Sequence, residues 1–349
     1  MSLLITGATG FIGRHLCAQL TREGRTVTAM LRQPGRQLPE LRRVVDELGG
    51  DGCRIEAISG DLDAPELGLS AALPEMDTII HLGARFGWRL APEVARQTNV
   101  AGSLAVARLA QSLGCRLVFI SGFMLENTQH LEQLGIMGVD PDAVNWQRVY
   151  RRAGAYEASK LEAAIRTRAY AKRAGLEFVE VQPATVAGSS KTGALDRAQP
   201  LYTLLDNLAR GRMAMVPGTP EHWLPLVAVD SLARLIGLAA TVERAPAKLL
   251  ALDPETPNLK NLLAIAASVL GTKAPRHHIP MWCLAALLVI PGLSRLMNTP
   301  PETLSFIQST RFNTADVERF MVEQEVPRTN IAEVVRKTAA FYSGQQSET

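Results

Sequence analysis

The chain contains 349 residues, 47% of them hydrophobic and 20% charged, a composition that fits a folded globular protein and excludes a disordered or fibrous one. Its 37 Lys and Arg residues nearly balance 34 Asp and Glu residues and are spread along the sequence, so no nucleic-acid partner is expected. The four cysteines form no CxxC pair and no secretory signal precedes the first apolar run, which predicts no zinc site, no disulfide framework and a cytoplasmic location.

Short apolar runs alternate with longer amphipathic stretches as far as residue 187, the pattern of successive βα units that build a parallel sheet. Three amphipathic stretches, Ile12–Glu23, Asn99–Leu113 and Tyr156–Ala174, end next to a glycine, which is typical of a helix terminus. We therefore expect an α/β protein with a Rossmann doubly wound parallel sheet in residues 1–187. The predicted strands are Leu3–Thr6, Thr26–Leu31, Arg54–Ser59, Thr78–Leu82, Leu117–Ser121 and Glu177–Gln182.

The second half of the chain has a different rhythm, with longer helical patterns separated by prolines. We expect residues 188–349 to form a smaller, mainly helical lobe that binds the substrate. One further strand, Lys248–Leu252, is predicted to return to the sheet, so residues 226–255 would join the first domain. The predicted helices of this half include Leu201–Gly211, Ser231–Thr241 and Leu259–Gly271.

The most apolar stretch, Ile279–Leu293, is 15 residues long and contains Pro280 and Pro291. A bilayer span needs about 20 apolar residues, so no transmembrane segment is expected. The stretch predicts a buried or pocket-lining helix. Shallow insertion into a membrane, or an acyl-lined pocket, is a second interpretation.

A glycine-rich turn, Thr6-Gly7-Ala8-Thr9-Gly10-Phe11-Ile12-Gly13, connects the first predicted strand to the first predicted helix. Gly7 permits a tight turn, Gly10 carries no Cβ that would block a pyrophosphate, and Gly13 lets helix and strand pack closely. The helix N-terminus adds free N–H groups and a partial positive charge, which suit a phosphate. The turn predicts dinucleotide binding by Gly7, Thr9, Gly10, Phe11, Ile12 and Gly13.

The end of the second predicted strand indicates which dinucleotide binds. An NAD site usually places a carboxylate here for the ribose 2′-hydroxyl, but this sequence has Arg32, whose guanidinium suits a 2′-phosphate. Arg14 and Arg36 are candidate helpers. We therefore expect NADP(H), with NAD(H) as the less favoured cofactor.

Further motifs follow the later strands in order. They are Gly60-Asp61-Leu62, His81-Leu82-Gly83-Ala84, Asn99 in Thr98-Asn99-Val100-Ala101-Gly102, Tyr156-Glu157-Ala158-Ser159-Lys160, and Gln182-Pro183-Ala184-Thr185-Val186-Ala187-Gly188. With these motifs the chain resembles the extended short-chain dehydrogenases/reductases, which include NAD-dependent epimerases and dehydratases. The resemblance implies that the cofactor also contacts Asp61, Leu62, Leu82, Gly83, Ala84, Asn99, Tyr156, Lys160, Pro183 and Val186.

Two branches of this family are most similar to the sequence. The segment from Gly60 to Ser70 resembles reductase domains that act on thioester-bound acyl chains. The tail around Arg276–Pro280 and Phe312-Asn313-Thr314 resembles the 3-beta-hydroxysteroid-dehydrogenase and acyl-ketone-reductase branch. Both likenesses imply a hydrophobic carbonyl substrate.

Tyr156 and Lys160 also have a chemical reading that does not depend on the resemblance. Residues at i and i+4 share a helical face, so the ammonium is expected to lower the pKa of the phenol from about 10 toward neutrality. Tyr156 would then protonate the alkoxide that hydride addition to a carbonyl creates, while Lys160 holds the ribose hydroxyls.

Ser121 marks a departure from the family pattern. The family has a Ser or Thr that holds the substrate oxygen at the position of Gly122, whereas this chain has Ser121 one residue earlier. Losing one oxyanion donor costs on the order of 10²–10³ in rate. We expect Ser121 to serve through a shifted turn; substitution by another hydroxyl such as Thr185, or impaired catalysis, is left open.

Other conspicuous residues have structural interpretations. His277 and His278 are adjacent and do not face one ligand together, so no metal site is predicted. His81 is expected to be structural, and Asp230 resembles an aspartate that caps a helix in the family. The tryptophans expected in core packing are Trp88, Trp223 and Trp282.

The sequence thus predicts an NADPH-dependent oxidoreductase that reduces a ketone, aldehyde or acyl thioester of a hydrophobic substrate, with Tyr156 as proton donor. An epimerase or dehydratase that recycles its cofactor is one alternative, and a cofactor-binding protein with impaired catalysis is another. The identity of the substrate, a carrier-protein partner and a homodimer are left open.

Overall fold

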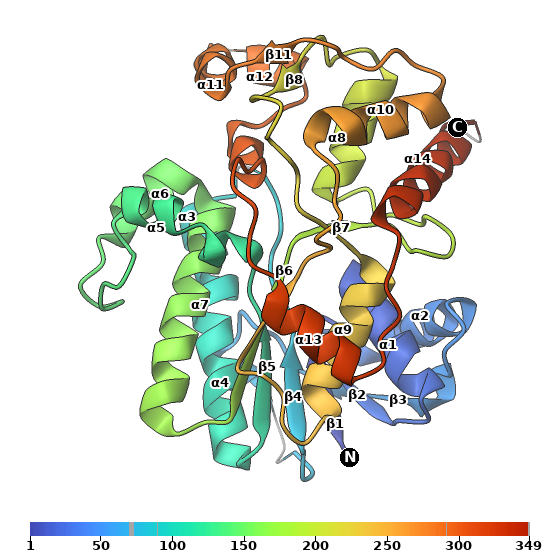
Figure 1. Ribbon diagram of the computed structural model, residues 1–349. Helices are drawn as coiled ribbons and strands as arrows, with labels where there is room; N and C mark the ends of the chain where they lie inside the picture. The colour runs from blue at the N-terminus through green and yellow to red at the C-terminus, as the bar shows by residue number, and fades with distance from the viewer. Residues whose placement is uncertain (70–72, 89, 291, 348–349) are drawn as a thin grey trace. The chain divides into compact units, whose positions relative to one another are not determined.

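Apolar segments form a seven-stranded sheet in the computed structural model, which describes residues 1–69, 73–88, 90–290 and 292–347 (Figure 1). The strand order is β10-β6-β5-β4-β1-β2-β3, and neighbouring strands run parallel, as in pairs such as β1 with β2 and β4 with β5. This order confirms the Rossmann doubly wound sheet. The strands are β1 (Leu3–Thr6), β2 (Val27–Leu31), β3 (Ile55–Ser59), β4 (Thr78–His81), β5 (Arg116–Ile120), β6 (Phe178–Pro183) and β10 (Lys248–Ala251).

The chain divides into two compact units. The first comprises Met1–Gln182 and Leu232–Leu250, and the second comprises Pro183–Ser231 and the chain from Ala251 onward. The strand predicted at Lys248–Leu252 is β10, which lies beside β6 at the edge of the sheet. A late segment of the chain therefore completes the first unit.

Helices cover both faces of the sheet in the first unit (Figure 1). On one face, α1 (Phe11–Arg22) lies with α2 (Pro34–Glu47) and α9 (Val229–Thr241). On the other face, α4 (Gly102–Leu113) lies beside α7 (Ala155–Ala174), and both end at a glycine in the left-handed region, Gly114 and Gly175. The shorter helices are α3 (Pro92–Ala95), α5 (Thr128–Leu134) and α6 (Trp146–Ala153).

The second unit is mainly helical. Two short strand pairs support it, β7 (Thr185–Ala187) with β9 (Leu226–Ala228) and β8 (Val216–Pro217) with β11 (His278–Ile279). This composition confirms the expected helical lobe. Its helices are α8 (Pro200–Ala209), α10 (Leu259–Leu270), α11 (Met281–Val289), α12 (Leu293–Leu296), α13 (Ala315–Glu323), α14 (Ile331–Ser347) and the 3₁₀ segment η5 (Pro301–Phe306).

The apolar stretch Ile279–Leu293 is only partly the buried helix that the sequence predicts. Within it, α11 buries Leu284 and Leu288 but exposes Trp282 and Val289. The core position predicted for Trp282 is therefore wrong, because apolar residues cover the whole circumference of this helix and only one side packs against the protein. Within the described residues, no helix combines the length and hydropathy needed to cross a bilayer.

Arg116 fastens β5 to the end of α9 inside the first unit. Its guanidinium donates to the carbonyls of Val242 at 2.7 Å and Glu243 at 2.8 Å, and to the Glu177 carboxylate at 2.6 Å. The carbonyls at a helix C-terminus lack intrahelical partners and carry partial negative charge, so a buried cation satisfies them.

Replacing Arg116 with Met should lower the free energy of unfolding by about 2–4 kcal/mol, because buried carbonyls lose their donors. Urea unfolding followed by circular dichroism measures this change. The matched control is Arg108→Met on α4, an exposed arginine whose loss should change stability by less than about 0.5 kcal/mol. Equal effects of the two substitutions would remove the structural role of Arg116.

Candidate active site

The glycine turn after β1 is held by contacts that leave no room for side chains. Gly7 adopts a positive φ of 75°, and a Cβ there would lie 2.7 Å from the main-chain nitrogen of Gly83. A Cβ on Gly13 would lie 2.2 Å from the carbonyl oxygen of Gly7. Because backbone atoms cannot yield to such contacts, both positions require glycine. The roles expected for Gly7 and Gly13 match this geometry.

A cleft of about 320 Å³ opens above this turn, at the carboxyl ends of β1, β2, β3 and β4. Ligands bind at this edge in doubly wound sheets. The N-terminus of α1 has neither a side-chain cap at Gly10 nor an acidic residue in its first turn, so its N–H groups suit a pyrophosphate. The predicted cofactor residues that line the cleft are Gly7, Thr9, Gly10, Arg32, Asp61, Leu62, Leu82, Gly83 and Ala84.

Other predicted cofactor residues lie elsewhere. Phe11, Ile12 and Gly13 form the first turn of α1 and do not line the cleft. Pro183 and Val186 are buried in β6 and β7 and belong to the second unit. Arg85, which sequence analysis missed, lines the cleft and forms a 3.1 Å ion pair with Asp63. Its position directly after the His81–Ala84 turn was the available signal.

Asn99 connects the cleft to α7. Its Oδ1 accepts from the Arg85 main-chain N–H at 2.7 Å, and its Nδ2 donates to the Ser159 hydroxyl at 2.9 Å. Ser159 in turn donates to the carbonyl of Tyr156 at 2.8 Å. Asn99 lies in a π-helical segment, Arg96–Ala101, whereas the sequence predicts that a regular helix begins at Asn99. Such segments occur often at functional sites.

His81 is a buried, neutral part of the same region. Its Nδ1 lies 2.6 Å from the Thr6 hydroxyl, which also accepts from the Gly83 N–H, and its Nε2 lies 2.9 Å from the Ser103 hydroxyl. Ser103 donates onward to the Asn99 carbonyl, so Ser103 accepts from Nε2–H and Thr6 donates to Nδ1. Burial, and then the charge of Lys160, lower the pKa of His81 to about 3. The residue is structural, as expected.

The expected effect of Lys160 on Tyr156 is not seen. Burial first, and then the charge of Glu157, raise the pKa of Tyr156 from 10.0 to about 12. The Lys160 ammonium donates to the Ile120 carbonyl at 2.7 Å, and burial lowers the pKa of Lys160 to about 8. Burial is the larger cause of the raised Tyr156 pKa, so the phenol stays protonated at neutral pH.

The end of β5 brings Ser121 toward this region. Its hydroxyl is buried and has no hydrogen-bond partner among the described residues. Ser121 comes directly after Ile120, whose carbonyl accepts a hydrogen bond from Lys160. Gly122 is extended, with φ −177°.

The Tyr156 ring makes edge contacts with two aromatic rings. The distance between ring centroids is 4.6 Å to Phe86 and 6.4 Å to Trp88, so Trp88 packs beside Tyr156. Sequence analysis missed Phe86.

Two other residues that the sequence singles out, Trp223 and Asp230, lie in the second unit. Trp223 is buried and lies under Arg311, as expected for a core residue. Asp230 does not cap α9: it lies in the first turn of that helix and its carboxylate accepts from the N–H and hydroxyl of Ser190. No cluster of metal-ligand type was found in the part of the chain that the structure describes.

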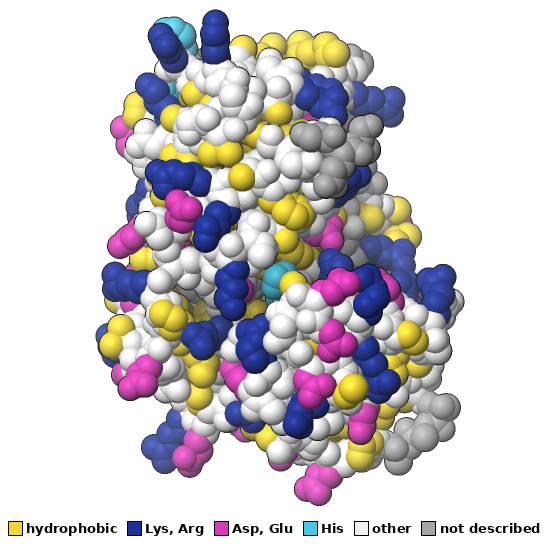
Figure 2. All heavy atoms as spheres, turned by 90° about the vertical axis from the view of Figure 1, so that its right-hand side faces the viewer, with side chains coloured by type: hydrophobic (Ala, Val, Ile, Leu, Met, Phe, Trp, Pro, Cys, Tyr) yellow, Lys and Arg dark blue, Asp and Glu magenta, His cyan; other side chains and the backbone are white. Residues whose placement is uncertain are grey.

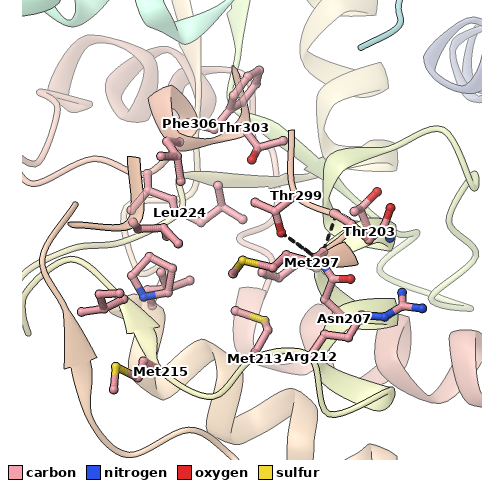
Figure 3. Close-up of a pocket in the computed structure, with 18 of the residues that line it drawn as sticks. Thr203, Asn207, Arg212, Met213, Met215, Leu224, Met297, Thr299, Thr303 and Phe306 are labelled. Atoms are coloured by element: carbon pink, nitrogen blue, oxygen red, sulfur yellow. Dashed lines mark hydrogen bonds between the residues drawn. The ribbon is translucent and has the colours of Figure 1, made fainter. Parts of the chain in front are cut away.

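The second unit contains a separate apolar cavity of about 340 Å³ (Figure 3). Asn207 is a buried polar residue in its wall. The Nδ2 of Asn207 donates to the Asn298 carbonyl and Thr299 hydroxyl, whereas its Oδ1 has no partner among the described residues. The apolar lining includes Leu204, Met213, Leu224, Leu284, Leu287 and Phe306.

Residues 5–236 match the model of an NAD-binding family described as male sterility protein. A PKS-NRPS hybrid synthetase of Chaetomium globosum is 28% identical over 247 residues, covering 67% of this chain and 5% of that protein. A 2-alkyl-3-oxoalkanoate reductase of Stenotrophomonas maltophilia is 29% identical over 217 residues, covering 62% of this chain and 58% of that protein. The chain therefore spans less than two thirds of either curated relative.

A solved structure supports the fold. The terminal R domain from the myxalamid PKS-NRPS pathway superposes with a TM-score of 0.73 at 19% identity, covering 99% of this chain and 91% of that chain.

The pKa of Lys160 predicts a pH dependence of stability. Burial lowers this pKa from 10.5 to about 8, so between these values the unfolded chain binds a proton that the folded chain does not. Raising the pH through this window should therefore favour the folded state. Between pH 8 and pH 10.5, the stability of the native protein relative to Lys160→Met should rise by about 1–2 kcal/mol.

Urea titrations at the two pH values measure this difference. Lys172→Met, an exposed lysine near the end of the same helix, is the control and should show no such change relative to the native protein. If the stability difference between the native protein and Lys160→Met does not change with pH, the Lys160 ammonium is solvated rather than buried.

Proposed function

The chain belongs to the male sterility protein family of extended short-chain dehydrogenases/reductases, NAD(P)-binding oxidoreductase enzymes, and we propose that it reduces the carbonyl of a hydrophobic substrate with NADPH. The observation that carries this proposal is the Asn99 side chain. It joins Arg85 in the wall of the cleft to the turn of α7 that bears Tyr156. This connection between the cleft and α7 supports Tyr156 as the proton donor.

The proposed chemistry divides between the cofactor and the protein. When bound, NADPH supplies the hydride that adds to the carbonyl carbon. The carbonyl oxygen becomes an alkoxide, to which the Tyr156 phenol gives its proton and the Ser121 hydroxyl donates a hydrogen bond. A Tyr156 pKa raised to about 12 favours reduction of the carbonyl over oxidation of the alcohol, because the phenol holds its proton at neutral pH. Lys160 is proposed to hold the ribose hydroxyls.

Three arginines support NADPH over NADH. Arg32 lines the cleft, and Arg14 and Arg36 line an adjoining pocket of about 260 Å³ that shares Thr9 and Gln37 with it. The carboxylate in that pocket, Glu40, is already paired with Arg43. The balance of charge therefore suits a 2′-phosphate.

The apolar cavity of the second unit supports a hydrophobic substrate. Its wall is mostly Leu, Met and Pro, and Figure 3 shows Asn207 among these side chains. The reductase of Stenotrophomonas maltophilia is named for a 2-alkyl-3-oxoalkanoate, a ketone with alkyl chains. We favour a ketone or acyl thioester with an aliphatic chain for this protein. A sugar-nucleotide epimerase would need more polar contacts than this cavity offers.

Removing the Arg32 guanidinium should selectively weaken NADPH binding. Arg32→Ala should raise the dissociation constant for NADPH about 10- to 100-fold and leave that for NADH unchanged, because only NADPH presents a phosphate. Fluorescence titration of each nucleotide measures both constants. Arg173→Ala, an exposed arginine near the end of α7, is the control. Tighter binding of NADH than of NADPH by the native protein would contradict the proposed specificity.

Tyr156→Phe and Ser121→Ala should each lower kcat by about 10²–10³ while NADPH still binds, because each removes a donor to the reacting oxygen. The assay follows NADPH absorbance with 3-oxoacyl thioesters and long-chain ketones. The control is Tyr170→Phe. The Tyr170 hydroxyl donates to Gln111 of α4, so its removal should leave full activity.

Consumption of NADPH equal to product formed supports the reductase. Turnover without net consumption of NADPH would instead identify an epimerase or dehydratase. Binding of NADPH with no turnover of any carbonyl would identify an impaired cofactor-binding protein, which the shift of the hydroxyl from Gly122 to Ser121 leaves as the second candidate.

A further inference from the structure

Exposed apolar side chains gather on α11 and α12 of the second unit. Eleven large hydrophobic residues are exposed among those described, and five of them lie between Met281 and Leu296. Three protrude strongly: Trp282 is 74% exposed, Val289 78% and Leu296 75%. Isolated exposed apolar residues are normal, but a cluster within 16 residues marks an interaction site. We name this cluster the α11 face, consisting of Trp282, Leu287, Val289, Ile290 and Leu296.

The sequence of α11 explains why the face stays uncovered. The helix reads Met-Trp-Cys-Leu-Ala-Ala-Leu-Leu-Val, with no charged side chain at any position. Leu284 and Leu288 are buried, which leaves an equally apolar opposite side. A helix that is apolar all round needs a second nonaqueous environment. With nine residues it is about 14 Å long, too short to cross a bilayer core of about 30 Å.

The charge around the α11 face is basic. From Thr256 to Pro301 the sequence contains no Asp or Glu, whereas Lys273, Arg276 and Arg295 are exposed in this stretch. A carboxylate from another segment, Glu221, interacts with His278, so the surroundings are basic on balance. Figure 2 shows a row of hydrophobic side chains at the top of the view, with Lys, Arg and His side chains near it.

The shape of the α11 face distinguishes between occupants. A protein partner needs complementary packing, and its core contacts fill grooves. Side chains exposed by about three quarters project outward instead, and a fluid acyl layer accommodates them without complementarity. Tryptophan is favoured at the level of lipid headgroups, and basic residues are attracted to anionic lipids.

We propose that the α11 face docks the protein on an anionic membrane surface. Trp282, Val289 and Leu296 enter the boundary between headgroups and acyl chains, and Lys273, Arg276 and Arg295 contact the headgroup phosphates. The helix lies in the plane of the surface and does not span the membrane. This inference stands apart from the reductase chemistry, since the three side chains that enter the lipid, Trp282, Val289 and Leu296, line neither the cleft nor the apolar cavity.

Sedimentation of the full chain with lipid vesicles tests the proposal. The protein should sediment with vesicles of phosphatidylcholine and phosphatidylglycerol, should bind much less to phosphatidylcholine alone, and should be released by high salt. The combined variant Trp282→Ser, Val289→Ser and Leu296→Ser should lower the partition coefficient at least tenfold. Lys273→Glu with Arg276→Glu should lower it by a similar factor on anionic vesicles.

Matched controls lie on α13 of the same unit. Val322→Ser removes a valine that is 68% exposed, and Arg319→Glu reverses an exposed charge, so neither should change vesicle binding. Circular dichroism and NADPH binding check that all variants are folded. NADPH binding should be unchanged in each, so a failed reductase assay and a failed membrane assay are separate results.

Two outcomes would overturn the proposal. One is no binding to anionic vesicles by the native protein. The other is light scattering that shows a dimer which the triple serine variant disrupts, together with vesicle binding that this variant retains; the α11 face would then be an interface between two copies.

Discussion

Backbone packing at the carboxyl ends of β1 and β4 is the constraint on which the cleft above the glycine turn depends. Two turns meet there backbone to backbone, since a Cβ on Gly7 would lie 2.7 Å from the main-chain nitrogen of Gly83. The Leu62 side chain from the turn after β3 packs on Gly83, where a Cβ would lie 2.6 Å from Leu62 Cδ1. This close approach positions the N-terminus of α1 over the strand ends. It also brings Gly83 within reach of the Thr6 hydroxyl, where the buried chain of hydrogen bonds through His81 begins.

That buried chain gives the site a rigid polar scaffold. Thr6, His81, Ser103 and Asn99 pass hydrogen bonds from β1 through β4 to the π-helical segment before α4. The Asn99 side chain then divides its three hydrogen bonds between Arg85 and Ser159. Because each group is satisfied by its neighbours, a displacement of one strand end would leave several buried polar atoms unpaired. The geometry around Tyr156 is thus set by residues that carry no reactive group.

Much of the fold was predictable because strands buried on both faces form continuous apolar runs, and all seven strands of the sheet lie within two residues of their predicted bounds. The glycine turn and the Tyr156–Lys160 spacing could also be recognised in the sequence. The burial of individual side chains could not be predicted, since it depends on packing between distant segments. The i,i+4 spacing therefore gave the wrong pKa direction for Tyr156, and the apolar character of α11 gave the wrong environment for Trp282.

The route of the chain has a consequence for engineering. The first unit is discontinuous, since residues 232–250 return to it and provide β10 beside β6. A fragment that stops before this return would leave the main-chain groups of β6 as an open sheet edge, which invites aggregation. Grafting a different second unit onto this scaffold would accordingly require two transplanted segments that flank a retained α9 and β10, whereas a single fusion junction would not suffice.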